Sequence, residues 1–283
     1  MTGARSERAI AVGVDASASC LDAVEWAARE AVLRGLPVRL IHGCVFIPAR
    51  PLRDGERAED VEEALLEHGR RWLRRAAAKA AEVAPVVSAE SQVRLGFATD
   101  VLLAESRSAS MLVVGSRGVG GLRGAMIGSV AQKVSAEASC PVIVVREPSR
   151  ADGPVVAGVD VWSGAEAVLE FAFEAACLRG VPLLVKHVFR GKGVAEAQER
   201  RVVEDLVAAW RGKYPGVEAR LLLASVRDPA RALLLSPPDT QLIVVGSRGR
   251  GPVTSGLFGS TGNTLISRAR CPVAVVHAPV GPP

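Results

Sequence analysis

The sequence predicts an α/β fold made of two tandem doubly wound domains, each with a five-stranded parallel sheet and helices on both faces. Three observations support this prediction. The 283-residue chain repeats itself over most of its length. In each half, short apolar runs typical of strands alternate with helical patterns. Each half also has the same glycine-rich pattern directly after an apolar run, where this class of fold places ligand-binding loops.

The repeat is defined by matching motifs. Gly115 lies 131 residues before Gly246, and the two Cys-Pro-Val motifs further along are related by the same offset. Near the N-terminus the offset is 145 residues, which matches Gly-Val-Asp at 13–15 with Gly-Val-Asp at 158–160. The fall from 145 to 131 is a net loss of 14 residues from the second half. Two copies of one domain explain this length better than one large domain does.

The link between the copies is short, polar and rich in proline and glycine. It reads Glu-Pro-Ser-Arg-Ala-Asp-Gly-Pro over residues 147–154. We therefore expect one domain over residues 1–147, a linker over residues 148–153 and a second domain over residues 154–283.

The patterns of the first half predict its elements in order, and the second half repeats this order. The first helix is expected to start near Ser17 or Ser19, either of which suits the N-cap, and to end at Gly35. Strands are expected at residues 9–14, 38–45, 86–95, 111–114 and 141–145, with helices at 16–33, 56–83, 99–106 and 130–137 and a loop at 46–54.

The composition is that of an ordinary globular protein, with 49% hydrophobic and 23% charged residues. No apolar run is long enough for a membrane span, and the first eight residues lack the apolar stretch of a signal peptide. The five cysteines show no metal-type spacing, and Cys140 and Cys271 are expected to be small buried residues in a reducing cytoplasm. The net charge of +5 permits polyanion binding, but only 4% aromatic residues argue against nucleic-acid binding.

The glycine pattern is the strongest functional signal. Each half reads Gly-Ser-Arg-Gly, nine residues, then Gly-Ser. Glycines let the backbone approach a ligand closely, and the N–H groups at the start of the next helix can bind an anion. A Walker-type phosphate loop is absent, and the glycines at 118–124 miss the spacing of a dinucleotide fingerprint. The pattern therefore predicts a phosphate-bearing ligand in each half.

The expected topology places this ligand. In open doubly wound sheets, ligands bind beyond the carboxyl ends of the strands, where the strand order reverses. Asp15 ends the first strand and Gly115 ends the fourth. If these strands are neighbours, the carboxylate and the glycine loop face each other across one crevice, and the same holds for Asp160 and Gly246.

These motifs together resemble a tandem-domain universal stress protein of the ATP-binding type. The family pattern Gly-x-x-Gly, nine residues, Gly-Ser/Thr is matched in both halves. The Gly-Val-Asp motifs, the second strands that end in His42 and His187, and the final Cys-Pro-Val strands match as well. The resemblance covers nearly the whole chain and implies an adenine nucleotide alpha hydrolase-like fold.

The resemblance also implies one adenine-nucleotide site in each domain. The first-strand Asp would lie against the adenosine, the residue after the second-strand His would border the adenine, and the glycine loop would approach the ribose and phosphates. The nucleotide-binding residues would be Gly13, Asp15, Gly43, Gly115, Ser116, Arg117, Gly118, Gly128 and Ser129 in the first half, and Gly158, Asp160, Val188, Gly246, Ser247, Arg248, Gly249, Gly259, Ser260 and Thr261 in the second.

The implied function is that of a stress-response nucleotide sensor. ATP, with ADP or AMP as alternatives, would stabilise one conformation that a protein partner or a homodimer reads. Mg²⁺ would be held through the phosphates and not by the protein alone. No residue set suggests efficient catalysis, so at most weak ATP hydrolysis is expected. The alternative is a slow ATPase or an adenylyl-transferring enzyme of the same superfamily, although the loop motifs of such transferases after the first strand are absent here.

The last strand of each half has an expected role in assembly. Members of the family often dimerise through this strand, which here covers Pro141–Val145 and Pro272–Val276. In a tandem chain the two domains can pair with each other in this way, which would cover two edges that are otherwise prone to aggregation.

Plainer structural roles are open to several of these residues. The glycines could serve tight turns, Asp15 and Asp160 could cap the first helix of each half, and the loop arginines could be ordinary surface residues. A dyad of Cys44 with His42 is discounted because the second copy has Phe189 in place of the cysteine. The sequence predicts that Gly→Ala at the start of either glycine loop weakens nucleotide binding and leaves the fold intact.

Overall fold

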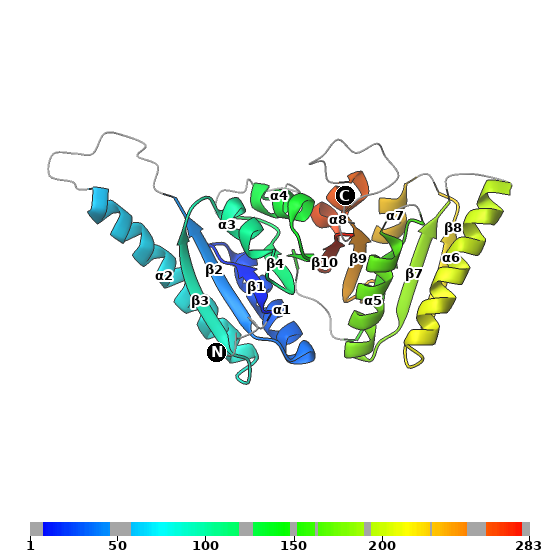
Figure 1. Cartoon of the computed structure of the whole chain (residues 1–283), viewed down its shortest axis with the longest axis horizontal. Helices are drawn as coiled ribbons and strands as arrows, with labels where there is room; N and C mark the ends of the chain where they lie inside the picture. The colour runs from blue at the N-terminus through cyan, green and yellow to red at the C-terminus, as the bar shows by residue number, and fades with distance from the viewer. Residues whose placement is uncertain are drawn as a thin grey trace, which may run out of the picture.

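One ten-stranded β-sheet runs through both halves of the chain, with helices on both of its faces (Figure 1). The computed structural model describes residues 8–45, 58–118, 127–147, 152–161, 164–189, 194–226, 228–247 and 259–278. The strand order is β3-β2-β1-β4-β5-β10-β9-β6-β7-β8, so each half contributes five adjacent strands.

Strands and helices alternate in the same order in the two halves. The first half contains β1 (Ile10–Gly13), α1 (Ala18–Arg34), β2 (Val38–Cys44), α2 (Ala58–Val83), β3 (Ala89–Leu95), α3 (Ala98–Glu105), β4 (Met111–Gly115), α4 (Ser129–Glu137) and β5 (Val142–Val145). The second half contains β6 (Val155–Gly158), α5 (Ala165–Arg179), β7 (Leu183–Val188), α6 (Val194–Lys213), β8 (Ala219–Ala224), α7 (Pro229–Leu234), β9 (Leu242–Gly246), α8 (Ser260–Arg268) and β10 (Val273–Val276).

The predicted fold class is confirmed, with small differences at element ends. The first helix begins two residues later than expected because Ser17 is its N-cap, in an extended conformation, and its side chain accepts a hydrogen bond from Cys20 N. The third strand begins at Ala89 and not at residue 86, because Val87 N donates to Ala84 O and closes a turn there. Gly35 ends α1 in the left-handed region, at φ 63°, as expected. The loop expected at residues 46–54 lies outside the described residues.

Within each half all strand pairs are parallel. β1 pairs with β2 on one side and with β4 on the other, and β6 pairs in the same way with β7 and β9. The strand order therefore reverses at β1 and at β6. Both faces of the sheet are covered by helices, which explains why the central strands read as continuous apolar runs and not as alternating patterns.

The two halves are joined through their last strands, as expected. β5 and β10 pair antiparallel, with Ile143 opposite Ala274 and Val144 opposite Val273. All four residues of each strand are buried. Neither strand is therefore an edge of the sheet, and the edges are formed by β3 and β8.

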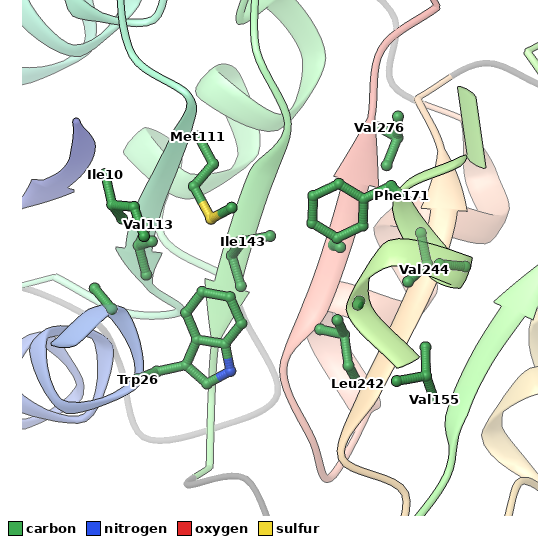
Figure 2. Packing of buried hydrophobic residues seen from close by; sticks show 14 of the residues in the cluster. Ile10, Trp26, Met111, Val113, Ile143, Val155, Phe171, Leu242, Val244 and Val276 are labelled. Carbon is green, nitrogen blue, oxygen red and sulfur yellow. The ribbon is translucent and has the colours of Figure 1, made fainter. Parts of the chain in front are cut away.

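The helices form two layers, and the core of each layer crosses the junction between the halves. α1, α2, α5 and α6 cover one face, and α3, α4, α7 and α8 cover the other. Figure 2 shows Trp26 of α1 beside Ile143 of β5, and Phe171 of α5 beside Val276 of β10. The buried side chains of the first layer form one cluster that includes residues of both halves.

A buried charged cluster links α1 to α5 across this junction. Glu30 is only 1% exposed, and its carboxylate accepts a 2.6 Å hydrogen bond from Arg34 Nε. The same carboxylate pairs with Arg179, which comes from the second half. Arg34 in turn donates to Glu174 of the second half at 2.7 Å. One carboxylate thus lies between two arginines, one from each half.

The same two arginines also stack across the junction. Arg34 lies over the ring of Phe171, 5.3 Å from its centroid, and Arg179 lies over Trp26 at 6.0 Å. Arg34 and Arg179 occupy equivalent positions in the repeat, and so do Trp26 and Phe171. Each half therefore places an arginine on the aromatic ring of the other, an arrangement that favours one fixed orientation of the two domains.

No helix in the described part of the chain is both long and apolar enough to span a membrane.

Cys140 and Cys271 are buried, as expected, and burial raises the pKa of each thiol from 9.0 to about 12.

The charged cluster predicts the effect of Glu30→Gln. The substitution leaves two nearly buried arginines without their shared carboxylate, so we expect it to lower the free energy of unfolding by about 3 kcal/mol. The measurement is urea unfolding. The control is Glu25→Gln on the same helix, where a partly exposed pair with Arg29 and Lys79 is lost and less than about 1 kcal/mol is expected. Equal losses for the two variants would contradict the role of the cluster.

The buried thiols predict a loss of stability at high pH. Above pH 9 the unfolded thiols of Cys140 and Cys271 lose their protons, whereas the folded thiols keep theirs up to about pH 12. The folded state then binds more protons, so its stability falls as the pH rises, by about 1.4 kcal/mol per pH unit for each thiol. Urea unfolding between pH 8 and pH 10.5 measures this slope. A variant with Cys140→Ala and Cys271→Ala should show a shallower slope, and an unchanged slope would refute the assignment.

Candidate functional site

A cavity of about 610 Å³ opens beyond the carboxyl ends of β1, β2 and β4 in the first domain. It lies where the strand order reverses, since β1 sits between β2 and β4. Its volume falls within the range of roughly 300–1,000 Å³ that is usual for small-molecule sites. Its lining consists of Gly13, Val14, Asp15, Ile41, Gly43, Ala98, Leu102, Val114, Gly115, Arg117, Gly118, Ile127, Gly128, Ser129, Val130 and Ala131.

Nearly all of the residues predicted for the first site meet at this cavity. The exception is Ser116, which is 3% exposed and is not part of the lining. Its backbone N–H donates to Val145 O at 2.8 Å, and its carbonyl accepts from Gly128 N at 2.9 Å. The backbone of Ser116 therefore joins the two ends of the glycine loop, and its side chain is buried outside the cavity lining. The cavity is lined by the predicted residues Gly13, Asp15, Gly43, Gly115, Arg117, Gly118, Gly128 and Ser129.

The apolar part of the lining was missed by the sequence analysis. Ile41 could have been found, because it lies two residues before Gly43 on the same strand and so shares its face of the sheet. Ala98 and Leu102 could not, because their place in the site depends on where α3 packs. The apolar lining residues are Val14, Ile41, Ala98, Leu102, Val114, Ile127, Val130 and Ala131.

The start of α4 forms the polar end of the cavity. Gly128 is the N-cap of α4, with φ −66° and ψ 144°, and no side chain caps the helix. The first N–H groups of a helix have no partner within the helix, and they carry the positive end of its dipole. Since Ser129, Val130 and Ala131 line the cavity, this end of the helix offers N–H donors to an anion.

Asp15 faces the glycine loop across the cavity. Its Oδ1 accepts hydrogen bonds from Ser17 N at 2.9 Å and from Ser17 Oγ at 2.6 Å. The N-cap of α1 is Ser17, so Asp15 is not itself the helix cap. Its other oxygen, Oδ2, lies 3.1 Å from the place where a Cβ on Gly118 would stand. The expected opposition of the carboxylate and the loop is therefore present in the first domain.

The glycines of the first site serve two different purposes. A Cβ on Gly115 would lie 2.8 Å from Ser19 O, and a Cβ on Gly43 would lie 2.8 Å from Ala98 Cα. These two glycines allow helices to pack closely on the strands. A Cβ on Gly128 would meet nothing closer than 3.4 Å, so Gly128 leaves open space at the cavity. Ala at Gly115 would meet the backbone carbonyl of Ser19, so we expect this substitution to cost stability as well as affinity.

His42 of β2 and His187 of β7 have the same structural role, although β2 continues to Cys44 and β7 to Val188. His42 Nδ1 donates to Val14 O at 2.7 Å, and His187 Nδ1 donates to Val159 O at 2.8 Å. Each imidazole thus binds the backbone just before the first-strand aspartate of its own half. Among the described residues, no group of three or more His, Cys, Asp or Glu side chains could hold a metal ion.

The second domain repeats the backbone arrangement of this site. Gly158 ends β6 next to Val245 of β9, and α8 begins at the N-cap Gly259, again without a side-chain cap. Gly259 N donates to Ser247 O at 3.4 Å, as Gly128 N does to Ser116 O in the first half. Of the other predicted residues, Asp160 follows β6, Val188 ends β7, Gly246 ends β9, Ser260 and Thr261 open α8, and Arg248 and Gly249 lie outside the described residues.

The residues at the equivalent positions of the second domain differ from those that line the first cavity. By the repeat offsets, Lys186 stands in place of Ile41, Val188 in place of Gly43, and Pro229 in place of Ala98. Lys186 Nζ donates to Ala232 O at 2.9 Å and to Ser236 Oγ at 3.1 Å, which ties the amine to the end of α7. Burial lowers the pKa of this amine below its usual value.

Comparison with known proteins identifies the same family twice along the chain. The sequence model of the universal stress protein family matches residues 7–146 and 153–277. Universal stress protein Rv2623 of Mycobacterium tuberculosis is 32% identical over 302 residues, covering 98% of this chain and 99% of the relative. A universal stress protein of Mycolicibacterium smegmatis is 32% identical over 295 residues, with 98% and 99% covered. The crystal structure of a universal stress protein from Archaeoglobus fulgidus has the same fold, with a TM-score of 0.74 and 23% identity over 95% of this chain and 96% of that one.

The packing of the glycines predicts different outcomes for two substitutions in one loop. Gly115→Ala places a methyl group against the backbone of Ser19, so we expect the protein without nucleotide to lose about 1–3 kcal/mol of stability. Gly118→Ala adds its methyl group at an exposed position beside Asp15, and we expect little change in stability. Thermal unfolding without nucleotide compares the two. Equal unfolding temperatures would show that α1 does not pack on Gly115 as described.

Proposed function

This chain belongs to the universal stress protein family, and on that premise we propose that it is an ATP-binding regulatory protein of the stress response. Each domain has one adenine-nucleotide site. The observation that carries the proposal is the cavity of the first domain, which combines an apolar wall, a carboxylate and an uncapped helix start at the place where a doubly wound fold binds ligands.

The cavity has a separate region for each part of a nucleotide. The apolar side chains of Ile41, Leu102 and Val114 take the base, which has a flat apolar surface. Asp15 Oδ2, which can only accept hydrogen bonds when ionised, takes a ribose hydroxyl. The first turn of α4 and the exposed Arg117 take the phosphates.

Mg²⁺ would be held at this site mainly by the phosphates of the nucleotide. The ion usually keeps several waters and needs only one or two carboxylates in addition to phosphate oxygens, so a dedicated protein cage is not required. Asp15 is the carboxylate that lines the first cavity. When bound, the ion would neutralise phosphate charge at the start of α4.

The second domain takes a nucleotide through the equivalent residues, from Gly158 and Asp160 to Ser260 and Thr261. We divide the chain into domains over residues 1–147 and 154–283, joined by residues 148–153. The cytoplasm is the proposed location, since it supplies ATP and keeps thiols reduced, and Cys20, Cys44, Cys140, Cys177 and Cys271 are free thiols.

Regulation follows from differential binding. Bound ATP stabilises the conformation in which the glycine loop is closed on the phosphates, and a protein partner or a second copy of the chain reads that conformation. The ligand shifts the equilibrium only by the difference between its affinities for the two conformations.

The first test is nucleotide content and binding. We expect the purified protein to release adenine nucleotide on denaturation, and the nucleotide-free protein to bind Mg-ATP in isothermal titration calorimetry. Asp15→Asn should weaken binding at the first site about tenfold, because a hydrogen bond to a charged group is lost. The control, Asp22→Asn, changes a carboxylate of α1 that is not part of the cavity lining and should leave binding unchanged. Absence of bound nucleotide, together with no heat from ATP, ADP or AMP, would refute the function.

A further inference from the structure

Two serine hydroxyls at the start of α1 hold the two walls of the first cavity. Ser17 Oγ donates to Asp15 Oδ1 at 2.6 Å, on the β1 wall. Ser19 Oγ donates to Arg117 O at 2.7 Å, on the glycine loop that follows β4. Segments almost one hundred residues apart in the chain are therefore joined through one helical turn.

Each of the two serine hydroxyls donates its hydrogen bond to a different side of the cavity. A serine hydroxyl has a single hydrogen to donate. The hydrogen of Ser17 goes to Asp15 and that of Ser19 goes to Arg117, so the 3.3 Å contact between the two Oγ atoms is not a hydrogen bond in this arrangement. Ser17 Oγ also accepts from Cys20 N as the helix cap. Ser19 is thus the residue that binds the glycine loop.

Gly115 makes this link geometrically possible. A Cβ on Gly115 would lie 2.7 Å from Ser19 Oγ and 2.8 Å from Ser19 O. Any larger residue at the end of β4 would therefore push the first turn of α1 away from the loop. The glycine at this position allows the serine to approach, and the serine then fixes the loop.

The Ser19 bond sets the direction of the next N–H group. The described chain has no cis peptide bond, and in a trans peptide the C=O and the following N–H point in opposite directions. Because Arg117 O points at Ser19, the N–H of Gly118 points away from α1. Gly118 N lies 3.4 Å from the place where a Cβ on Gly128, the N-cap of α4, would stand. Gly118 N therefore lies next to the start of α4, at the end of the cavity that the first turn of this helix lines.

We propose that Ser19 is a positioning residue for the phosphate subsite of the first domain. Its hydroxyl prevents the Arg117–Gly118 peptide, which glycine makes easy to rotate, from turning its carbonyl oxygen towards the phosphates. The N–H of Gly118 then adds a donor to those of α4. This inference deepens the proposed function and rests on it.

The second domain lacks both hydroxyls at the equivalent positions. The position of Ser17 is taken by Trp162 and that of Ser19 by Gly164, and neither residue has a hydroxyl. Gly164 is the N-cap of α5 and has φ 69°, so the backbone here also differs from that of the first half. The two sites therefore differ in how firmly the phosphate loop is held, and the first site binds phosphate-bearing ligands more tightly.

The test compares ligands with and without phosphate. In calorimetry with nucleotide-free protein, Ser19→Ala should weaken ADP binding at the tight site about tenfold, the effect of losing one hydrogen bond that orders the subsite. Adenosine affinity should change less than about twofold, because adenosine has no phosphate for the N–H group of Gly118 to bind. Ser19→Thr keeps the hydroxyl and should restore most of the ADP affinity.

A matched control removes a similar bond elsewhere. Ser108→Ala deletes a hydroxyl that donates to Glu105 O at the end of α3, and it should change neither affinity. Equal losses for ADP and adenosine in Ser19→Ala would show a general structural effect and overturn the proposal, as would no loss at all. A wild-type protein that binds neither ligand would refute the proposed function itself.

A second measurement does not depend on any variant folding. In the wild-type protein, the amide proton of Gly118 should shift downfield in NMR spectra when ADP is added and stay nearly unchanged with adenosine. A Gly118 amide that responds equally to both ligands would overturn the assignment of this N–H to the phosphate subsite.

Discussion

The antiparallel pairing of β5 with β10 is the contact on which the rest of this molecule depends. Each of these strands is apolar and buried throughout, so in a single isolated domain either one would be an exposed edge that favours aggregation. Their pairing makes one sheet, and the core on each face of that sheet continues across the junction. It also brings α1 against α5 and α4 against α8, where Gln132 reaches Asn263 at 3.5 Å. α4 and α8 therefore lie side by side at the domain junction (Figure 1).

Within each domain, the crevice follows from the reversal of strand order, and its shape follows from the glycines. Gly43 and Gly115 are required because helices pack directly on them, whereas Gly128 leaves space at the start of a helix. One glycine motif thus contains a residue on which a helix packs and a residue that leaves open space at the cavity.

The two halves share the same strands and backbone contacts, but they differ in the residues at the positions that line the first cavity. The shared features are repeated because the same apolar runs form the same strands and the same histidine binds the same carbonyl in each half. The positions around the cavity differ between the halves: Lys186 stands in place of Ile41, and its amine is bound at the end of α7. Duplication thus provides two positions for a site without making the two sites equal.

The sequence by itself determined the fold class, the repeat, the order of the elements and most of the residues that meet at the first cavity. These depend on local patterns, namely apolar periodicity and glycine spacing, which one segment carries alone. Only the tertiary structure showed that Ala98 and Leu102 complete the cavity, and that Glu30 pairs with Arg179 of the other half as well as with Arg34. Such contacts join segments far apart in the chain, and their geometry depends on how helices pack on the sheet, which no local pattern records.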